Sequence, residues 1–258
     1  MQIITLTTDF GTRDWFVGTM KGVILGIAPR AAIVDITHEI PPGDIRAGAF
    51  ALGASCRFFP KGTVHLAVVD PGVGGARKAI AVQTTKYFFV GPDNGVLSFA
   101  LAREKIKSVR RLENPDYILH PVSRTFHGRD IFAPVAAQLS RGAAIRGSGP
   151  AQQDFIRLSW PKPRVQRNRV AGEVVFVDRF GNAITNIESA VLNAPDRLEV
   201  FVGRKRLCQV KAFYQSVRTG QAVAVPGSSG FLEIAVNGGS AARRFGLNIG
   251  SRISVCRS

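Results

Sequence analysis

Residues 63–75 read TVHLAVVDPGVGG and contain the clearest sign of the fold. The run 63–69 is apolar and has the length of a buried strand, and it ends in a Gly-rich turn that begins at Asp70. A similar arrangement opens the chain, where the short apolar run 3–7 leads into Thr-Asp9-Phe-Gly. Both segments predict a strand that runs into a polar loop.

Helix-like segments alternate with these strands over the first 150 residues. Asp14 is a candidate cap for a helix that extends to about residue 27, and Asp44 is a candidate cap for a second helix. Further strands are expected at 31–37 and within 79–90, and a further helix is expected near Arg129. Strands that alternate with helices predict an α/β domain with a central, mostly parallel sheet. In such sheets ligands bind beyond the carboxyl ends of the strands, where Asp9 and Asp70 are expected to lie.

The pattern changes near residue 159. Residues 159–169 contain two prolines and several basic residues, and we interpret them as a linker between an N-terminal domain, 1–158, and a C-terminal domain, 170–258. The second domain consists of short strand-like runs separated by turns, with no long helical period. It predicts a small all-β antiparallel, barrel-like domain.

Composition excludes several classes of protein. The 258 residues are 45% hydrophobic and 20% charged, which is typical of a globular protein and not of a disordered one. No uninterrupted apolar run approaches about 18 residues, and the N-terminus does not resemble a signal peptide, so we expect a cytoplasmic protein with no membrane association. Three widely spaced cysteines do not form a disulfide framework.

The formal net charge of +16 invites a nucleic-acid interpretation. The basic residues are scattered, however, and the densest run, 157–169, has Trp160 as its one aromatic residue. No DNA- or RNA-binding motif accompanies it. We therefore do not expect nucleic acid as a partner.

Four Gly-rich segments carry polar residues that suit a site, because glycine lets the backbone approach a ligand closely. The polar residues of the first three segments also have purely structural interpretations. Asp9 and Asp70 can be turn residues, Arg77 can be a surface arginine, and His127 can be a local hydrogen-bonding group. No metal-site spacing, serine-hydrolase elbow, phosphate-binding P-loop or dinucleotide fingerprint is present. The four segments are Thr8-Asp-Phe-Gly11, Asp70-Pro-Gly-Val-Gly-Gly-Ala-Arg77, Thr125-Phe-His-Gly-Arg-Asp130 and Asp178-Arg-Phe-Gly-Asn-Ala-Ile-Thr-Asn186.

Taken together, in this order and over nearly the whole chain, these segments resemble the S-adenosyl-L-methionine hydroxide adenosyltransferases, relatives of fluorinase and chlorinase. The resemblance implies hydrolysis of S-adenosylmethionine to adenosine and methionine, by attack of water or hydroxide at the ribose C5′. It implies a catalytic trio of Asp70, Arg77 and His127, and it implies that Asp9 holds the ribose hydroxyls. It implies no metal and no further cofactor.

The resemblance also implies a substrate-binding group in the C-terminal domain and a homotrimer with each site at a subunit interface. For the two aromatic residues of that group, a place in the hydrophobic core is an equal alternative. The implied binding residues are Asp178 and Asn182 at the methionine and ribose end, Ser228, Glu233, Val236 and Asn237 near methionine and adenine, and Phe180 and Phe213 beside the purine or the sulfonium.

Three departures separate this chain from the halogenases it resembles. Gly43 stands where fluorinase has a tryptophan, Gly128 replaces its halide-binding serine, and Asp70 replaces its tyrosine. A carboxylate beside the reacting carbon repels a halide and orients water. We therefore expect a hydrolase, with a halogenase and a non-catalytic S-adenosylmethionine or adenosine binder as the alternatives.

Overall fold

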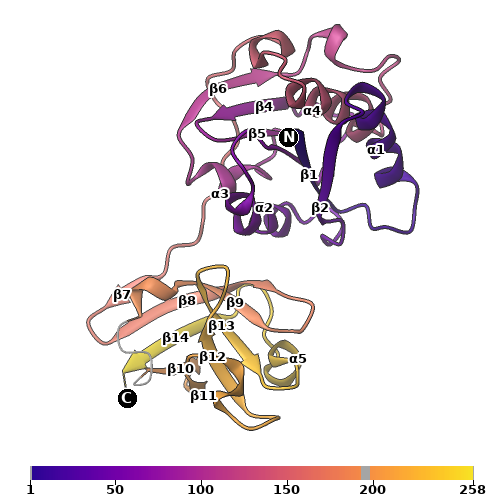
Figure 1. The fold of residues 1–258 in the computed structure, drawn as a ribbon. Helices are drawn as coiled ribbons and strands as arrows, with labels where there is room; N and C mark the ends of the chain where they lie inside the picture. The colour runs from indigo at the N-terminus through magenta and orange to yellow at the C-terminus, as the bar shows by residue number, and fades with distance from the viewer. Residues whose placement is uncertain (1, 193–197, 258) are drawn as a thin grey trace. The chain divides into compact units, whose positions relative to one another are not determined.

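The computed structural model describes residues 2–192 and 198–257. By its internal contacts the chain divides into two units, Met1–Ser159 and Trp160–Ser258 (Figure 1). Each unit has its own sheet and its own hydrophobic core.

The first unit contains a six-stranded sheet in the order β2-β1-β3-β5-β4-β6. The pairs β1–β2, β1–β3 and β3–β5 are parallel, and β4 alone runs antiparallel to its neighbours β5 and β6. The predicted mostly parallel sheet is confirmed. The strands are β1 (Gln2–Thr8), β2 (Ala31–Thr37), β3 (Val64–Val68), β4 (Ala79–Thr84), β5 (Phe88–Pro92) and β6 (Ile106–Arg111).

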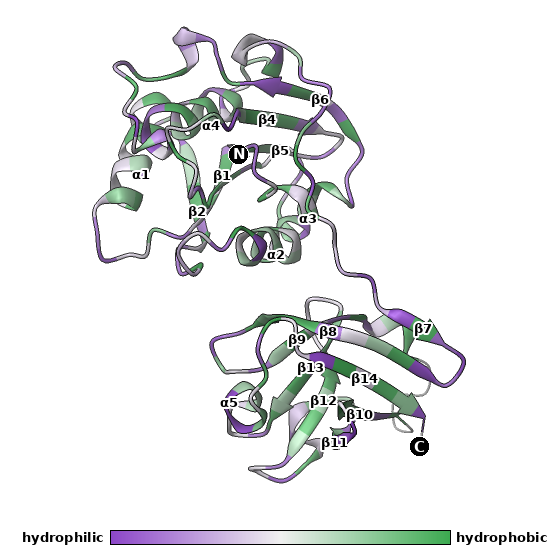
Figure 2. Ribbon diagram, turned by 180° about the vertical axis from the view of Figure 1, so that it is seen from behind, coloured by the Kyte–Doolittle hydropathy of each residue, from purple (hydrophilic) through white to green (hydrophobic). Residues whose placement is uncertain are grey.

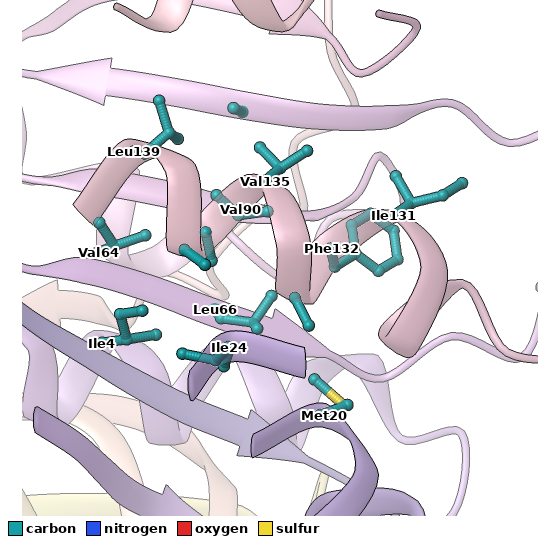
Figure 3. Close-up of a cluster of buried hydrophobic side chains, with 14 of the residues drawn as sticks. Ile4, Met20, Ile24, Val64, Leu66, Val90, Ile131, Phe132, Val135 and Leu139 are labelled. Atoms are coloured by element: carbon teal, nitrogen blue, oxygen red, sulfur yellow. The ribbon is translucent and has the colours of Figure 1, made fainter. Parts of the chain in front are cut away.

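Helices cover both faces of this sheet. Figure 1 shows α1 (Phe16–Ile27) and α4 (Ala133–Ser140) on one face, and α2 (Ile45–Ser55) and α3 (Ser98–Leu101) on the other. Alternate strand residues serve the two faces: Ile4 and Leu6 join the core beneath α1 and α4, whereas Thr5 points the other way. Figure 3 shows this core, in which Met20 and Ile24 of α1 approach the apolar side chains of β1, β3 and α4.

Two helix starts in the first unit differ from the prediction. Asp14 does not cap α1, which begins after Trp15 without a side-chain cap. The helix expected near Arg129 begins as a π-helical turn, Gly128–Phe132, that continues into α4. The predicted cap of α2 is confirmed, since Asp44 accepts a 2.9 Å hydrogen bond from the Ala47 amide.

The second unit contains an eight-stranded sheet whose strand pairs are all antiparallel, in the order β11-β10-β14-β8-β9-β13-β12, with β7 beside β8. A parallel bridge between Val210 and Ala224 joins the two ends of this order, so the sheet closes into a barrel-like shape, as predicted. Hydrophobic stretches run along β12 and β14 (Figure 2). The strands are β7 (Arg164–Gln166), β8 (Arg169–Val177), β9 (Ala183–Glu188), β10 (Leu198–Val202), β11 (Lys205–Gln209), β12 (Ala222–Pro226), β13 (Phe231–Val236) and β14 (Arg252–Arg257).

Three features of the second unit were not anticipated. Part of the expected linker 159–169 forms strand β7, which pairs with the start of β8. Strand β9 lies within a stretch that the sequence analysis treated as a site segment. A short helix, α5 (Ala241–Phe245), follows β13.

Candidate functional site

The two carboxylates expected at the sheet edge lie at the ends of neighbouring strands. Asp9 follows β1 and Asp70 lies two residues beyond β3. Because β1 and β3 are parallel, with Thr8 opposite Val68, both loops leave the same edge of the sheet. The parallel pairing therefore brings together two loops that are some 60 residues apart in sequence, as the numbering shows.

Arg77 clamps the carboxylate of Asp70. Its Nε donates to both carboxylate oxygens, at 2.9 and 3.0 Å, and its Nη2 also donates to Oδ2. Both side chains are well buried, with 4% of Asp70 and 11% of Arg77 exposed, so this ion pair is little screened by solvent. The guanidinium also lies 5.3 Å from the centre of the Phe132 ring. These contacts fix the Asp70 side chain in one orientation.

His127 completes the trio through the same arginine. Nη2 of Arg77 lies 2.7 Å from Nδ1 of His127. A guanidinium can only donate, so Nδ1 must accept, and the proton of the neutral ring is then on Nε2. Burial and the nearby Arg77 charge lower the pKa of His127, against smaller opposing effects of Asp70 and Asp130. Burial and Arg77 therefore both favour the neutral imidazole.

The loop of Asp70 and the loop of His127 are in direct contact at Gly74. This glycine has a φ of +75°, and a Cβ there would lie 2.1 Å from the carbonyl oxygen of Arg124. No side chain fits at such a distance. Gly74 therefore lets the segment that carries Arg77 approach the segment that carries His127 closely enough for their hydrogen bond.

Asp9 keeps one oxygen available for a ligand. Its Oδ2 accepts a 2.8 Å hydrogen bond from the Gly43 amide, and its Oδ1 has no hydrogen bond among the described residues. The turn at Gly43 also lies beside the Asp70 loop, since a Cβ at Gly43 would be 3.7 Å from Cβ of Pro71. Asp9 is half-buried and is a ready acceptor for hydroxyl groups.

The second unit contains a cavity of about 960 Å³. This is the size of a site for a drug-sized or nucleoside-sized molecule. All of the C-terminal residues singled out in the sequence line it: Asp178, Phe180, Asn182, Phe213, Ser228, Glu233, Val236 and Asn237.

One wall of the cavity is the loop between β8 and β9, which Asp178 organises. Its Oδ1 accepts from the backbone amides of Phe180, at 2.9 Å, and Asn182, at 2.8 Å. Its Oδ2 accepts from Nδ2 of the Asn182 side chain at 2.9 Å, which leaves the side-chain oxygen Oδ1 of Asn182 to accept from a ligand. Asp178 therefore shapes the loop in addition to lining the cavity.

Two aromatic rings line the cavity without joining the core. Phe180 is 76% exposed and Phe213 is 60% exposed. The core alternative for these two residues is wrong. Flat apolar rings that stand exposed in a cavity suit stacking on a planar heterocycle.

Sequence reasoning missed Tyr214, whose hydroxyl donates to Glu233 Oε1 at 2.6 Å on the cavity wall. Burial raises the pKa of Glu233, and nearby Asp178 raises it further, while the bond from Tyr214 opposes the shift. Burial and Glu233 together raise the pKa of Tyr214. The available signal was that Tyr214 adjoins Phe213. Its partner Glu233 is 19 positions away in β13, so no local pattern links the two.

No cluster of three or more histidine, cysteine, aspartate or glutamate side chains in 2–192 and 198–257 has the geometry of a metal site. Within those same ranges, no helix has the length and apolar character needed to cross a membrane.

Comparison with known proteins covers both units. Residues 4–149 match the family model for the SAM hydroxide adenosyltransferase N-terminal domain, and residues 172–254 match the model for the C-terminal domain of the same family. An (R)-S-adenosyl-L-methionine hydrolase of Salinispora tropica is 41% identical, over 98% of this chain and 97% of that protein. A fluorinase of Actinoplanes sp. is 27% identical over 99% of this chain and 98% of its own length. The crystal structure of an uncharacterized conserved protein from Thermotoga maritima superposes with a TM-score of 0.93 at 41% identity, covering 99% of this chain and 100% of that one.

Proposed function

Because this chain belongs to the SAM hydroxide adenosyltransferase family, we propose that it hydrolyses S-adenosyl-L-methionine to adenosine and L-methionine. The observation that carries the proposal is the hydrogen-bonded trio of Asp70, Arg77 and His127 at the carboxyl edge of the sheet. Its residue types and their order match the family trio one by one. The cavity in the second unit supplies a binding surface of suitable size.

In the proposed reaction, a water oxygen forms a bond to C5′ of the ribose while the bond from C5′ to sulfur breaks. The electron pair of that bond stays on sulfur, so the sulfonium leaves as the neutral thioether of methionine. The water loses one proton in the process. Alignment of the water oxygen, C5′ and sulfur in one line supplies much of the rate enhancement.

Within the trio, the geometry suggests different roles for the Asp70 carboxylate and the neutral His127 ring. Asp70 accepts a hydrogen bond from the attacking water and then its proton, and Arg77 keeps the carboxylate oriented. His127 has its Nδ1 occupied by Arg77, so a proton arriving there would break that bond. We therefore assign His127 a donor role through Nε2–H, toward the oxygen of the water.

We propose the remaining site residues as substrate contacts. Asp9 accepts from the ribose hydroxyls through Oδ1, for which the described part of the chain supplies no hydrogen bond. Phe180 and Phe213 stack on or wall the purine, in keeping with their exposed rings in the cavity. The other contacts, at the methionine, ribose and adenine groups, are Asp178, Asn182, Ser228, Glu233, Val236 and Asn237.

The deciding experiment is incubation of the purified protein with S-adenosylmethionine in halide-free buffer, with adenosine and methionine followed by chromatography. Asp70→Asn is the matched variant, because it keeps the shape of the side chain and removes its charge. We expect the wild type to form the two products in equal amounts and the variant to lose most of its activity. Binding without turnover favours a non-catalytic binder, and product formed only after addition of chloride or fluoride favours a halogenase.

We also propose a homotrimer in which each active site draws on two subunits, which the family resemblance implies. Light scattering measures the mass of the assembly. Two variants that are each expected to lose most of their activity, Asp70→Asn and Asn182→Ala, are then mixed under conditions that exchange subunits. Recovery of activity supports shared sites, and an active monomer refutes them.

A further inference from the structure

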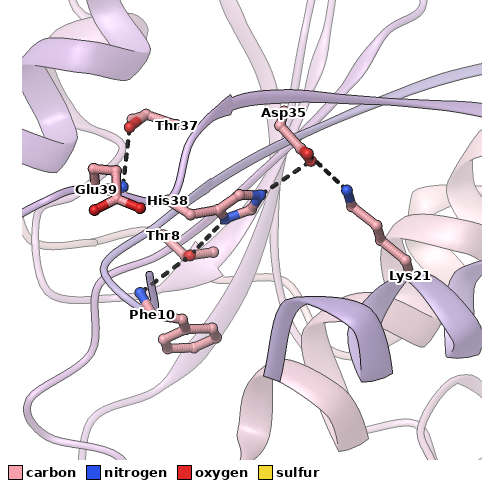
Figure 4. Close-up of polar contacts among 7 residues, drawn as sticks. All are labelled: Thr8, Phe10, Lys21, Asp35, Thr37, His38 and Glu39. Atoms are coloured by element: carbon pink, nitrogen blue, oxygen red, sulfur yellow. Dashed lines mark hydrogen bonds and ion pairs between the residues drawn. The ribbon is translucent and has the colours of Figure 1, made fainter. Parts of the chain in front are cut away.

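A second group of polar side chains in mutual contact lies beside the Asp9 loop and takes no part in the proposed chemistry (Figure 4). His38 follows β2 and is only 4% exposed. Its Nδ1 lies 2.8 Å from the hydroxyl of Thr8, the last residue of β1. Its Nε2 lies 3.0 Å from Asp35 Oδ1, a close contact without regular hydrogen-bond geometry, and Asp35 in turn accepts a 2.6 Å hydrogen bond from Lys21 of α1.

The donors and acceptors of this chain fit one consistent arrangement. The Thr8 hydroxyl oxygen accepts from the Phe10 amide at 3.3 Å, so its own hydrogen is free to donate to Nδ1 of His38. The remaining ring proton is then on Nε2 and faces the Asp35 carboxylate. Lys21 and His38 both favour the charged carboxylate, and together they outweigh burial and lower the pKa of Asp35.

The same segments are also joined through their backbones around Asp9. The Gly11 amide donates to the His38 carbonyl at 2.8 Å, and the Ile40 amide donates to the Thr8 carbonyl at 3.4 Å. Asp9 lies between Thr8 and Gly11, and its Oδ2 accepts a hydrogen bond from the amide of Gly43, farther along the His38 segment. The side-chain hydrogen bond between Thr8 and His38 is thus a buried contact that holds the residue next to Asp9 in place.

We propose that His38, held between Thr8 and Asp35, is a positioning residue that orients Asp9 for the ribose hydroxyls of the substrate. This inference rests on the proposed function, because the hydroxyls are the groups that Asp9 is to bind. The ring touches no substrate. It acts by holding Thr8, and through Thr8 the first turn of the loop that carries Asp9.

The chain offers a matched control on the same strand. Thr5 and Thr8 are both fully buried in β1, and each places its hydroxyl 2.8 Å from Nδ1 of a histidine, Thr5 with His65 and Thr8 with His38. Thr5→Val and Thr8→Val therefore remove equivalent buried bonds, but only the second bond adjoins Asp9. Thr8→Ser restores the hydroxyl and serves as the rescue variant.

The test compares adenosine with 2′,3′-dideoxyadenosine by calorimetry, alongside steady-state kinetics with S-adenosylmethionine. For Thr8→Val we expect the dissociation constant of adenosine and the KM to rise about tenfold, the loss expected for one misplaced hydrogen bond to a charged group. The dissociation constant of dideoxyadenosine and kcat are expected to stay within about threefold. Thr5→Val and Thr8→Ser should keep the wild-type preference for adenosine, whatever their thermal stability.

The outcomes separate this proposal from the proposed function. A wild type that forms no adenosine from S-adenosylmethionine refutes the function, and a wild type that binds both nucleosides equally refutes the role of Asp9 and this inference with it. An active wild type whose preference survives in Thr8→Val refutes the positioning role alone. Should Thr8→Val not fold, His38→Gln supplies the same comparison, because its amide reaches toward Asp35 and leaves Thr8 without its acceptor.

Discussion

Replacement of Gly74 by alanine tests whether the contact between two loops holds the proposed catalytic trio together. The added methyl group would lie 2.1 Å from the Arg124 carbonyl oxygen, whereas a comfortable distance is about 3.3 Å. The loops must therefore separate by about 1 Å. The hydrogen bond between Arg77 and His127, 2.7 Å long here, would then exceed hydrogen-bond range.

We expect Gly74→Ala to lower kcat about 100-fold, because a misplacement of about 1 Å in a catalytic group has consequences of that order. The free energy of unfolding should fall by about 2–4 kcal/mol, from the left-handed backbone and the displaced loop. The assay is adenosine formation by chromatography, with urea unfolding measured in parallel.

Gly62→Ala is the control for this variant. Gly62 also has a positive φ, +91°, but a Cβ there would have no atom within 4 Å. It should lose about 1 kcal/mol of stability and keep its kcat within about twofold. If Gly74→Ala retains wild-type kcat while folded, close contact of the two loops is not what brings Arg77 to His127.

Three further predictions concern single side chains. The pKa of His127 lies below its ordinary value of 6.5, and the neutral ring is the form that accepts from Arg77. The value of kcat should therefore be full above that lowered pKa and fall as the pH drops through it. A kcat that already declines above pH 6.5 as the pH is lowered contradicts this. Burial lowers the pKa of His65 to about 3, so on acidification the unfolded state binds a proton at this ring before the folded state does. The wild type should therefore lose about 3 kcal/mol of unfolding free energy between pH 7 and pH 4 through this ring. Urea melts of His65→Phe should not show this loss. Tyr214→Phe removes the hydroxyl that holds Glu233 and should raise the KM about fivefold with little change in kcat; an unchanged KM would place this pair outside the binding surface.

Much of the first unit could be predicted because its signals are local. Apolar runs of strand length marked β1 and β3, and the alternation with helices predicted that they lie parallel. The position of Asp9 and Asp70 at one edge then followed from sheet geometry. Asp44 was predicted as a cap because its bond to Ala47 spans only three residues.

The features that were missed depend on partners far away in the sequence. Strand β9 lies in a stretch that was interpreted as a Gly-rich site segment, and it contains the buried polar residues Thr185 and Asn186. In the fold, Thr185 donates to the Leu232 carbonyl, and Asn186 both donates to Pro161 and accepts from Glu173. A buried polar side chain is acceptable where such a partner exists, and no local pattern reveals the partner.

The trio shows how one cation can set the state of two neighbours. A lone buried carboxylate would be costly, and a lone imidazole beside it would gain a proton. Arg77 bonds to both, so it compensates the charge of Asp70 and at the same time opposes protonation of His127. The site thereby keeps a charged acceptor and a neutral donor side by side. That combination suits a water nucleophile, which needs one group to take its proton and another to orient its oxygen. The need to bond both neighbours also explains why an arginine lies between Asp70 and His127. A lysine, with its single side-chain nitrogen, would not hold both partners in fixed directions.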